Sequence, residues 1–294
     1  MATERNKVSA SDFEAGMFDL DGATEFKNIL VFGDSGVGKT VLAGTCPGRV
    51  LFLAGEPGYI SAARQGAKGT VRIVQDPATA LAAADWLDAG GATKYDWVVV
   101  DGLGTMQNKF LLTYAAEAFD ANPAKRAHRN LPDKPDYFNA QNFIKSWVSR
   151  LIDVPANVLF TAHAMRPEND EGERVVYPGI QGKGYEVSNY VCGLMHAVGF
   201  MSIRVRKTAD GAEQVRRILW RNYRDPESET TYFAKDQFNA LGTFTDDLTM
   251  SEILAMIDSG ETITSAGIPQ PTGTSFAEEA ATKPRRRAPA RRAR

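Results

Sequence analysis

The amino-acid sequence predicts an α/β domain built on a mostly parallel sheet, and three observations predict it. Short, continuous apolar runs alternate with helical patterns over the first half of the chain. These runs lack the polar positions of a half-exposed strand, as expected where both faces of a sheet are covered. The first run leads directly into a glycine-rich turn and then into a helical segment, the order of a strand–turn–helix unit.

The predicted elements follow the chain in order. We expect strands at residues 28–32, 50–54, 71–74, 97–100 and 158–161. We expect helices at residues 38–45, 57–65, 78–89, 105–120 and 137–152. Two longer strands at 194–206 and 214–223, with Asp210 and Gly211 in a tight turn between them, predict a C-terminal β-hairpin extension. A short amphipathic helix follows at 249–258, and Gly260 would stop it.

Charge is distributed unevenly along the 294 residues. Seven of the 34 basic residues and none of the 36 acidic ones lie in 281–294. The composition of the chain ends predicts a flexible arm at 1–23, one domain at 24–260 and a disordered arginine-rich tail at 261–294. A basic tail favours a polyanionic partner, most often nucleic acid, and its candidate contacts are Arg285, Arg286 and Arg287.

The composition also argues against several classes of protein. Two distant cysteines, Cys46 and Cys192, do not suit a disulfide scaffold or a structural zinc site and fit a reducing cytosol. No apolar run approaches the roughly 20 residues that span a bilayer, so we expect no membrane partner. The predicted location is therefore the cytoplasm.

The strongest functional motif is a complete G-x-x-x-x-G-K-[ST] sequence between the first strand and its helix. Its residues are Gly33, Asp34, Ser35, Gly36, Val37, Gly38, Lys39 and Thr40. Glycines let backbone N–H groups surround phosphate oxygens. Lys39 would reach the β- and γ-phosphates, and the Thr40 hydroxyl would bind Mg²⁺. The motif predicts ATP and Mg²⁺ as cofactors.

Three further strands are predicted to end in polar residues at the same edge of the sheet. Asp101 follows an apolar strand in a Walker B arrangement and would hold Mg²⁺ through water. Gly102 stands where many ring-forming ATPases carry a catalytic Glu, so Glu56 is the predicted activator of water. Glu56 could instead cap the helix that follows it. Thr161 and His163 end another strand and would sense the γ-phosphate, with a purely structural role equally open for His163.

Together these residues resemble the RecA-type ATPase core. More narrowly, the chain resembles the core-only RecA-like proteins of bacteriophages, the Sak-type single-strand-annealing recombinases, also grouped as AAA-like phage nucleotide-binding proteins. The resemblance covers residues 24–242 and implies a RecA-like P-loop NTPase core that hydrolyses ATP. The segments that carry it are LFLAGEPG around Glu56, VVVDGLG around Asp101, LFTAH ending at His163, PGIQGKG at 178–184 and YFAKDQF around Lys235.

The resemblance implies two loops that hold single-stranded DNA, at 121–135 and 164–184. Cations suit contacts with the DNA backbone, and an aromatic ring suits stacking on a base. Solvated surface loops are the alternative. The candidate contacts are Lys125, Arg126, Arg129 and Lys134 in the first loop and Arg166, Arg174, Tyr177 and Lys183 in the second.

The resemblance also implies self-association into a filament or ring, with the site completed across a subunit boundary. Lys235 best matches the cation that would reach a neighbour's γ-phosphate, and Arg221 and Arg224 are substitutes. The expected function is ATP-dependent binding and annealing of single-stranded DNA in phage recombination or replication, in the host bacterial cytosol. A helicase loader or replication accessory ATPase acting on a protein partner is the alternative. A P-loop kinase for a small metabolite is a more distant one.

Overall fold

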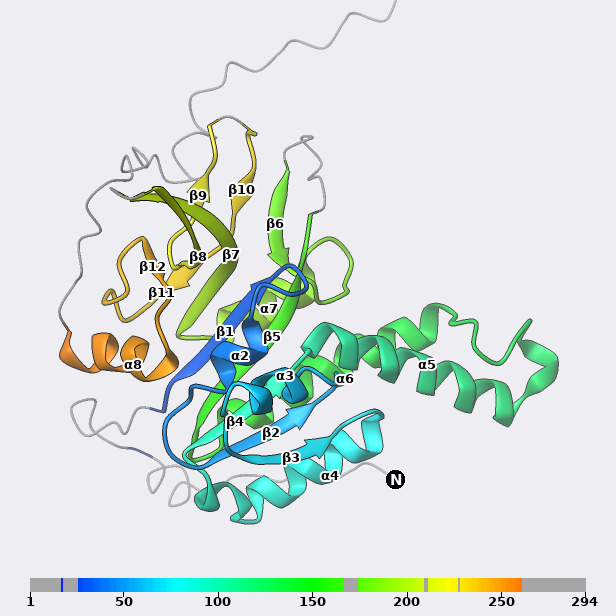
Figure 1. Cartoon of the computed structure of the whole chain (residues 1–294). Coiled ribbons are helices and arrows are strands. Elements are labelled where there is room, and N and C mark those ends of the chain that lie inside the picture. The colour runs from blue at the N-terminus through cyan, green and yellow to red at the C-terminus, as the bar shows by residue number, and fades with distance from the viewer. Residues whose placement is uncertain (1–16, 18–25, 167–173, 209–210, 227, 261–294) are drawn as a thin grey trace, which may run out of the picture.

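The computed structural model describes residues 17, 26–166, 174–208, 211–226 and 228–260 (Figure 1). The predicted arm at 1–23, apart from Met17, lies outside the described residues, as does the predicted tail with Arg285, Arg286 and Arg287. Asp210 of the predicted turn and residues 167–173 of the second predicted DNA loop also lie outside them. Within the described ranges, no helix has the length and apolarity that crossing a bilayer requires.

Parallel strands form the centre of the molecule (Figure 1). They are β1 (Asn28–Gly33), β2 (Val50–Ala54), β3 (Thr70–Ile73), β4 (Trp97–Asp101), β5 (Asn157–Met165) and β7 (Ala197–Thr208). Their order is β7-β1-β5-β4-β2-β3, and each neighbouring pair runs parallel. The predicted α/β fold with a mostly parallel central sheet is confirmed.

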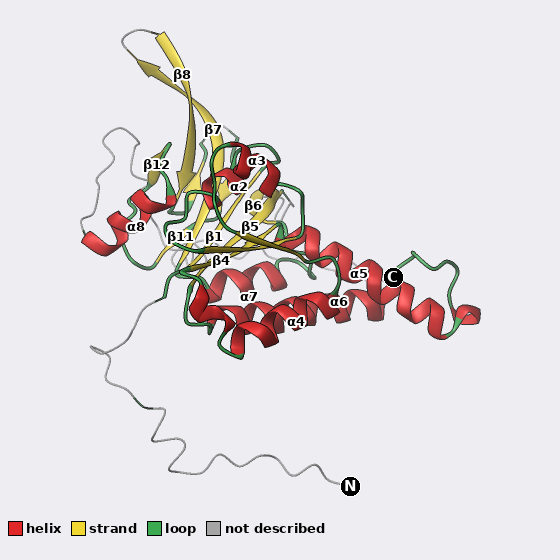
Figure 2. Cartoon of the chain, turned by 60° about the horizontal axis from the view of Figure 1, so that its bottom comes forward, coloured by secondary structure: helices red, strands yellow, loops and turns green. Residues whose placement is uncertain are grey.

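The predicted C-terminal hairpin is part of this central sheet. Its first strand, β7, lies parallel beside β1, and β8 (Gly211–Leu219) runs antiparallel beside β7. The far end of the hairpin projects from the body of the molecule (Figure 2). Shorter strands pair with members of the sheet: β12 (Phe244–Asp246) with β8 and β11 (Lys235–Asp236) with β7. Beyond the end of β5, β6 (Val175–Pro178) pairs with β5 and β10 (Thr231–Tyr232), and β10 pairs with β9 (Tyr223–Arg224).

Helices cover both faces of the sheet (Figure 2). One face carries α4 (Pro77–Asp88), α5 (Leu103–Ala121), α6 (Lys134–Ile152) and α7 (Glu186–Leu194). The other carries α2 (Lys39–Ala43), α3 (Tyr59–Arg64) and α8 (Met250–Ser259). Short 3₁₀ turns lie at Gly91–Lys94 and Pro123–Lys125. Helices α5 and α6 form a long antiparallel pair that extends beyond the sheet (Figure 1).

The alternation of side chains along each strand divides the core in two. On β1, Leu30 and Phe32 pack with the helices α4 to α7, while Ile29 and Val31 pack with α2 and α8. Because both faces of β1, β2 and β4 are buried, these strands need no polar positions, which explains their continuous apolar runs. Strand β3, at the edge of the sheet, is instead exposed along its whole length. The two free thiols lie on opposite faces of the sheet. Cys192 is in the core beside α4 to α7, and Cys46 is in the core beside α2 and α8.

Some predicted ends of strands and loops are wrong where the element depends on pairing with distant parts of the chain. The strand expected at 194–206 begins at Ala197, because the preceding residues form α7, which the sequence analysis did not identify. The second long strand ends at Leu219 rather than at residue 223. The segment 164–184 is also not a continuous loop, because its β6 pairs with both β5 and β10.

Candidate active site

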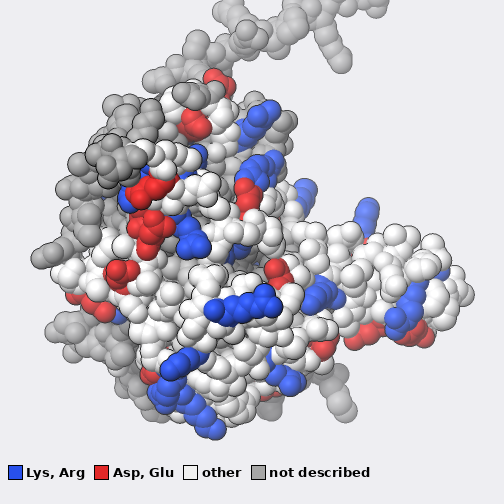
Figure 3. All heavy atoms as spheres, viewed as in Figure 1, with Lys and Arg blue, Asp and Glu red and all other residues white. Residues whose placement is uncertain are grey.

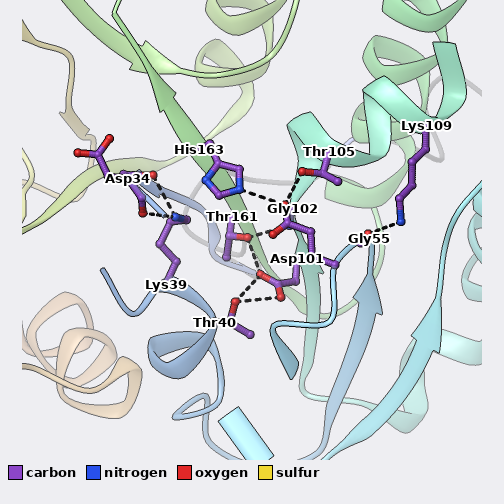
Figure 4. A network of polar contacts seen from close by, with 12 residues as sticks. Asp34, Lys39, Thr40, Gly55, Asp101, Gly102, Thr105, Lys109, Thr161 and His163 are labelled. Atoms are coloured by element: carbon purple, nitrogen blue, oxygen red, sulfur yellow. Dashed lines mark hydrogen bonds and ion pairs between the residues drawn. The ribbon is translucent and has the colours of Figure 1, made fainter. Parts of the chain in front are cut away.

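The carboxyl ends of β1, β5, β4 and β2 meet at one edge of the sheet (Figure 4). The strand register places Gly33 beside His163 and Ala54 beside Asp101. Glu56 follows β2 by two residues and therefore reaches the same edge. The structure thus brings together the P-loop, Asp101, Glu56 and His163. The sequence predicted this grouping because the carboxyl ends of parallel strands lie at one edge of a sheet.

The P-loop joins β1 to α2. Gly36 and Gly38 have φ angles of 80° and 103°, which glycine adopts without steric cost. The Lys39 ammonium donates to the carbonyls of Gly33 at 3.0 Å and Asp34 at 2.7 Å. Burial lowers the pKa of Lys39, and nearby carboxylates oppose that shift. A phosphate group at this loop would supply the anionic partner that a buried ammonium requires.

The two residues predicted to hold Mg²⁺ are in contact. The Thr40 hydroxyl lies 3.0 Å from each oxygen of the Asp101 carboxylate, and the Thr161 hydroxyl donates to the same carboxylate at 2.7 Å. Burial raises the pKa of Asp101, and these hydrogen bonds oppose the shift. A Cβ on Gly58 would lie 2.7 Å from Thr40 Oγ1, so the bare glycine backbone keeps this space clear. A hydroxyl and a carboxylate suit Mg²⁺, and the set fits the ion.

Glu56 lies over Gly102. Its Oε1 accepts a hydrogen bond from the Thr105 hydroxyl and lies 3.2 Å from His163 Nε2. Gly102 has a φ of 89°, and a Cβ there would lie 2.6 Å from Glu56 Oε1. A side chain at position 102 and the Glu56 carboxylate would therefore compete for one space. The capping alternative for Glu56 is not observed, because α3 begins after Gly58 without a side-chain cap.

Two polar residues of α5 that the sequence analysis did not single out contact this edge. Thr105 holds Glu56, and the Lys109 ammonium donates to the Gly55 carbonyl at 2.6 Å (Figure 4). They lie four residues apart and so share one face of the helix. That spacing, directly after the strand that ends in Asp101, is the sequence signal that could have identified them.

Arg166, a predicted DNA contact, lies at the P-loop. Strand β5 continues to Met165 and carries the arginine to the edge where β1 ends. Its guanidinium donates to the Asp34 carboxylate at 2.6 Å. This hydrogen bond lowers the pKa of Asp34. Both side chains are about half exposed. In this structure the cation is thus paired within the nucleotide site.

The first predicted DNA loop holds its two arginines in ion pairs. Arg126 pairs with Asp136, whose side chain is 2% exposed, and Arg129 pairs with Asp120 at 2.6 Å. The acids belong to α6 and α5, outside the loop, so the charge balance of the loop alone overstated its free positive charge. These arginines stabilise the end of the helical pair rather than forming an unpaired basic surface. Lys125, Arg129 and Lys134 of the predicted set are exposed, and Arg129 is held in its pair with Asp120.

The second predicted DNA loop does not present Tyr177 to a base. Tyr177 lies in β6, and its ring stacks between those of Tyr185 and Phe233, with centroid distances of 4.7 and 4.8 Å. Both faces of the ring are therefore covered, which leaves none for a base. Arg174 and Lys183 are exposed.

A buried amide ties α5 to the PGIQGKG segment. Gln107, 1% exposed, donates to the Gln181 carbonyl at 2.8 Å and accepts the Gln181 N–H at 2.6 Å. A Cβ on Gly104 would lie 2.1 Å from the Gly179 carbonyl oxygen, so the two backbones are in direct contact. The Gly179 N–H in turn donates to the His163 carbonyl at 2.6 Å. The helix after Asp101 and the strand of His163 thus both contact one segment.

Lys235 contacts its own chain. Its ammonium donates to the carbonyls of Cys192 at 3.2 Å and Gly193 at 3.1 Å, near the end of α7, where a helix favours a cation. In the pairing of β11 with β7, Lys235 lies opposite Val198. Val198 comes three residues before Met201, the residue of β7 that lies beside Gly33 of the P-loop. Lys235 therefore lies away from the nucleotide site of its own chain. A role at a neighbour's site stays a prediction.

The sequence matches a protein-family model over a range that includes this site. A family model described as an AAA domain matches residues 25–238. No curated protein matches the sequence. Among solved structures, the chain is similar to the flagellar accessory protein FlaH from Methanocaldococcus jannaschii, with 9% identity, a TM-score of 0.33 and coverage of 76% of this chain and 90% of that chain. It is also similar to the KaiC-like protein PH0186 from Pyrococcus horikoshii OT3, with 11% identity, a TM-score of 0.34 and coverage of 70% and 90%.

The family match takes in the whole candidate site. It includes the P-loop, Glu56, Asp101 and His163, and it ends after Lys235. The hairpin β7–β8 is also inside it. The chain therefore belongs to the AAA domain family and contains a P-loop ATPase domain.

Proposed function

We propose that this chain hydrolyses Mg²⁺–ATP and uses the reaction to control its hold on single-stranded DNA. The process it serves would be annealing or strand exchange in phage recombination or replication. One observation carries the hydrolytic part: Lys39, Thr40, Asp101 and Glu56 lie together at one edge of the sheet, in hydrogen-bonded positions.

Each side chain in this set has a separate task. The P-loop amides and Lys39 bind the phosphates, and Thr40 and Asp101 hold the metal, which when bound neutralises charge on the phosphate oxygens. Thr105 and His163 both contact Oε1 of Glu56, and among the described residues no donor contacts Oε2. Oε2 is the atom that would accept a proton from the attacking water.

The link to DNA rests on the PGIQGKG segment. It contacts α5 through Gln107 and the His163 strand through Gly179, so a ligand on this segment would act on both. Lys183 within it, and Lys125 and Lys134 at the end of the helical pair, are exposed cations that suit phosphate contacts. Basic and acidic side chains are mixed over the face in Figure 3, so the proposed contacts are local rather than one broad basic surface. A neighbouring subunit would complete the site through Lys235.

The test combines DNA binding with ATP turnover. We expect a single-stranded oligonucleotide to raise turnover and a nonhydrolysable ATP analogue to tighten DNA binding. Lys39→Ala should lose both effects, because it removes the phosphate contact. A chain that binds no oligonucleotide, and whose turnover is indifferent to DNA, would contradict the DNA part of the proposal and leave the hydrolytic part standing.

A second candidate, a helicase loader or replication accessory ATPase, is favoured by the surface of the helical pair α5–α6. Leu112, Leu131 and Phe138 are exposed there, and Phe138 is 67% exposed. Exposed apolar groups on a projecting element suit a protein partner. In that case DNA would stimulate turnover weakly and a phage or host replicative helicase would co-purify with the chain. The same turnover experiment therefore separates the two candidates.

A further inference from the structure

Arg216 of the hairpin strand β8 lies against the P-loop. A Cβ on Gly38 would lie 2.8 Å from Arg216 Nε, 3.1 Å from its Cδ and 3.6 Å from its Cζ. Gly38 directly precedes Lys39, so a guanidinium from one part of the sheet stands beside the phosphate-binding turn of another. Nothing in the local sequence around residue 216 indicates this contact, because it depends on the register of β8.

The strand geometry fixes this position. Residues two apart on a strand face the same side, so Arg216 continues the face of Ile218. Ile218 packs in the same core cluster as Val37, which lies within the P-loop, and Leu42 of the helix that follows it. The backbone of Arg216 is held at both polar groups: its N–H donates to the Asp247 carboxylate at 2.8 Å, and its carbonyl accepts the Asp247 N–H at 2.8 Å.

The guanidinium of Arg216 differs from those of its neighbours. Arg217 pairs with Asp246 at 2.8 Å, and Arg206 of β7 pairs with Glu213. Among the described residues, neither a hydrogen bond nor an ion pair engages the Arg216 side chain, which is exposed. Its position beside Gly38 adds an exposed cation to the phosphate-binding turn, and an anion bound at that turn would stabilise it.

We propose that Arg216 binds the diphosphate part of the nucleotide, the part that ATP and ADP share. This inference rests on the proposed function. The catalytic carboxylates and His163 come from β2, β4 and β5, on one side of β1, and they mark the γ-phosphate end of the site. Strand β8 lies on the other side of β1, beyond β7. A guanidinium from that side meets the phosphates nearer the nucleoside, where it forms charge-assisted hydrogen bonds.

The experiment measures binding of ADP and of a nonhydrolysable ATP analogue to the full-length chain by calorimetry. Arg216→Ala is compared with Arg204→Ala, which removes the same charge from the same hairpin. Arg204 is in register with Val215 and so faces the opposite side of the sheet from Arg216. We expect Arg216→Ala to lower the affinity for both nucleotides by the same factor, about tenfold. Arg204→Ala should leave both affinities unchanged.

Several results would overturn this assignment. Unchanged affinity of Arg216→Ala for both nucleotides would remove it, as would a loss of DNA binding alone. A loss confined to the ATP analogue would place the guanidinium at the γ-phosphate and contradict the proposed contact. An equal loss in Arg204→Ala would show an effect of net charge rather than of position. If the wild-type chain bound neither nucleotide, the proposed function itself would be wrong. Failure of the proposed function is therefore distinguishable from failure of the Arg216 contact alone.

Discussion

Glu56 and Gly102 share one space at the edge of the sheet. The Glu56 carboxylate approaches so closely that a Cβ on Gly102 would lie 2.6 Å from its Oε1. The strand that ends in Asp101 therefore needs a glycine next, and the carboxylate that fills the space beside it comes from Glu56, after the neighbouring strand β2. This relationship links two features of the sequence, the missing Glu after Asp101 and the presence of Glu56.

Gly102→Ala is expected to displace Glu56 and to lower ATP turnover about a hundredfold, because a small misplacement of a catalytic group has effects of this size. Nucleotide affinity should change little, since the P-loop is untouched. Steady-state phosphate release and nucleotide binding check the two effects separately.

The matched control for this variant is Gly66→Ala. Gly66 has a φ of 90°, close to the 89° of Gly102, but a Cβ there meets nothing within 4 Å. Both variants therefore carry the backbone strain of about 1 kcal/mol, and only one carries the clash. Equal turnover in the two variants would contradict the proposed competition between Glu56 and residue 102.

Gln107→Leu should uncouple DNA from ATP turnover. The change keeps a similar volume but leaves the carbonyl and N–H of Gln181 without the amide that they bind, at a cost of about 2 kcal/mol. Urea unfolding measures that cost. We expect basal turnover to stay near its wild-type value while the stimulation by single-stranded DNA is lost.

The exposed neighbour Asn108 provides the comparison, because Asn108→Ala alters the same helix without touching the PGIQGKG segment. Full DNA stimulation in Gln107→Leu would show that this contact does not transmit the effect of DNA.

The ion pair between Arg126 and Asp136 should stabilise the chain in a pH-dependent way. The hydrogen bonds of Arg126 lower the pKa of Asp136, so the pair stabilises the fold above the ordinary pKa of Asp, about 3.9, and this contribution is lost as the pH falls through the lower folded value. Asp136→Asn should lower the free energy of unfolding by about 2 kcal/mol at pH 7. The difference from wild type should shrink as the pH approaches 3.

Urea unfolding between pH 3 and pH 7 checks this dependence. The exposed pair in the same loop, Arg129 with Asp120, is the control, and Asp120→Asn should have a much smaller effect because solvent screens it. A difference for Asp136→Asn that is constant with pH would show that the carboxylate charge is not what stabilises the loop.

The sequence was sufficient for features that depend on local order along the chain. The P-loop, the polar ends of β2, β4 and β5, and the α/β class follow from short runs of residues and from the rule that parallel strands end at one edge. Helix α7 was not predicted, but it could have been, because Val187, Val191 and Leu194 are spaced as on one helical face.

The remaining features depend on which distant residues meet. Arg126 and Arg129 looked free because their acids lie in the flanking helices. Tyr177 looked available for a base because Tyr185 and Phe233 cover it only after β6 has paired. A count of residues within one loop cannot identify partners that the fold brings from outside it.

Glu56→Gln removes the carboxylate that is proposed to activate water for hydrolysis of ATP at this P-loop. The exposed Glu117→Gln on α5 makes the same chemical change outside the site. We expect Glu56→Gln to bind ATP as tightly as wild type while its rate of phosphate release falls at least about a hundredfold. Glu117→Gln should keep the wild-type rate. Phosphate release at the wild-type rate from Glu56→Gln would show that Glu56 does not activate the attacking water.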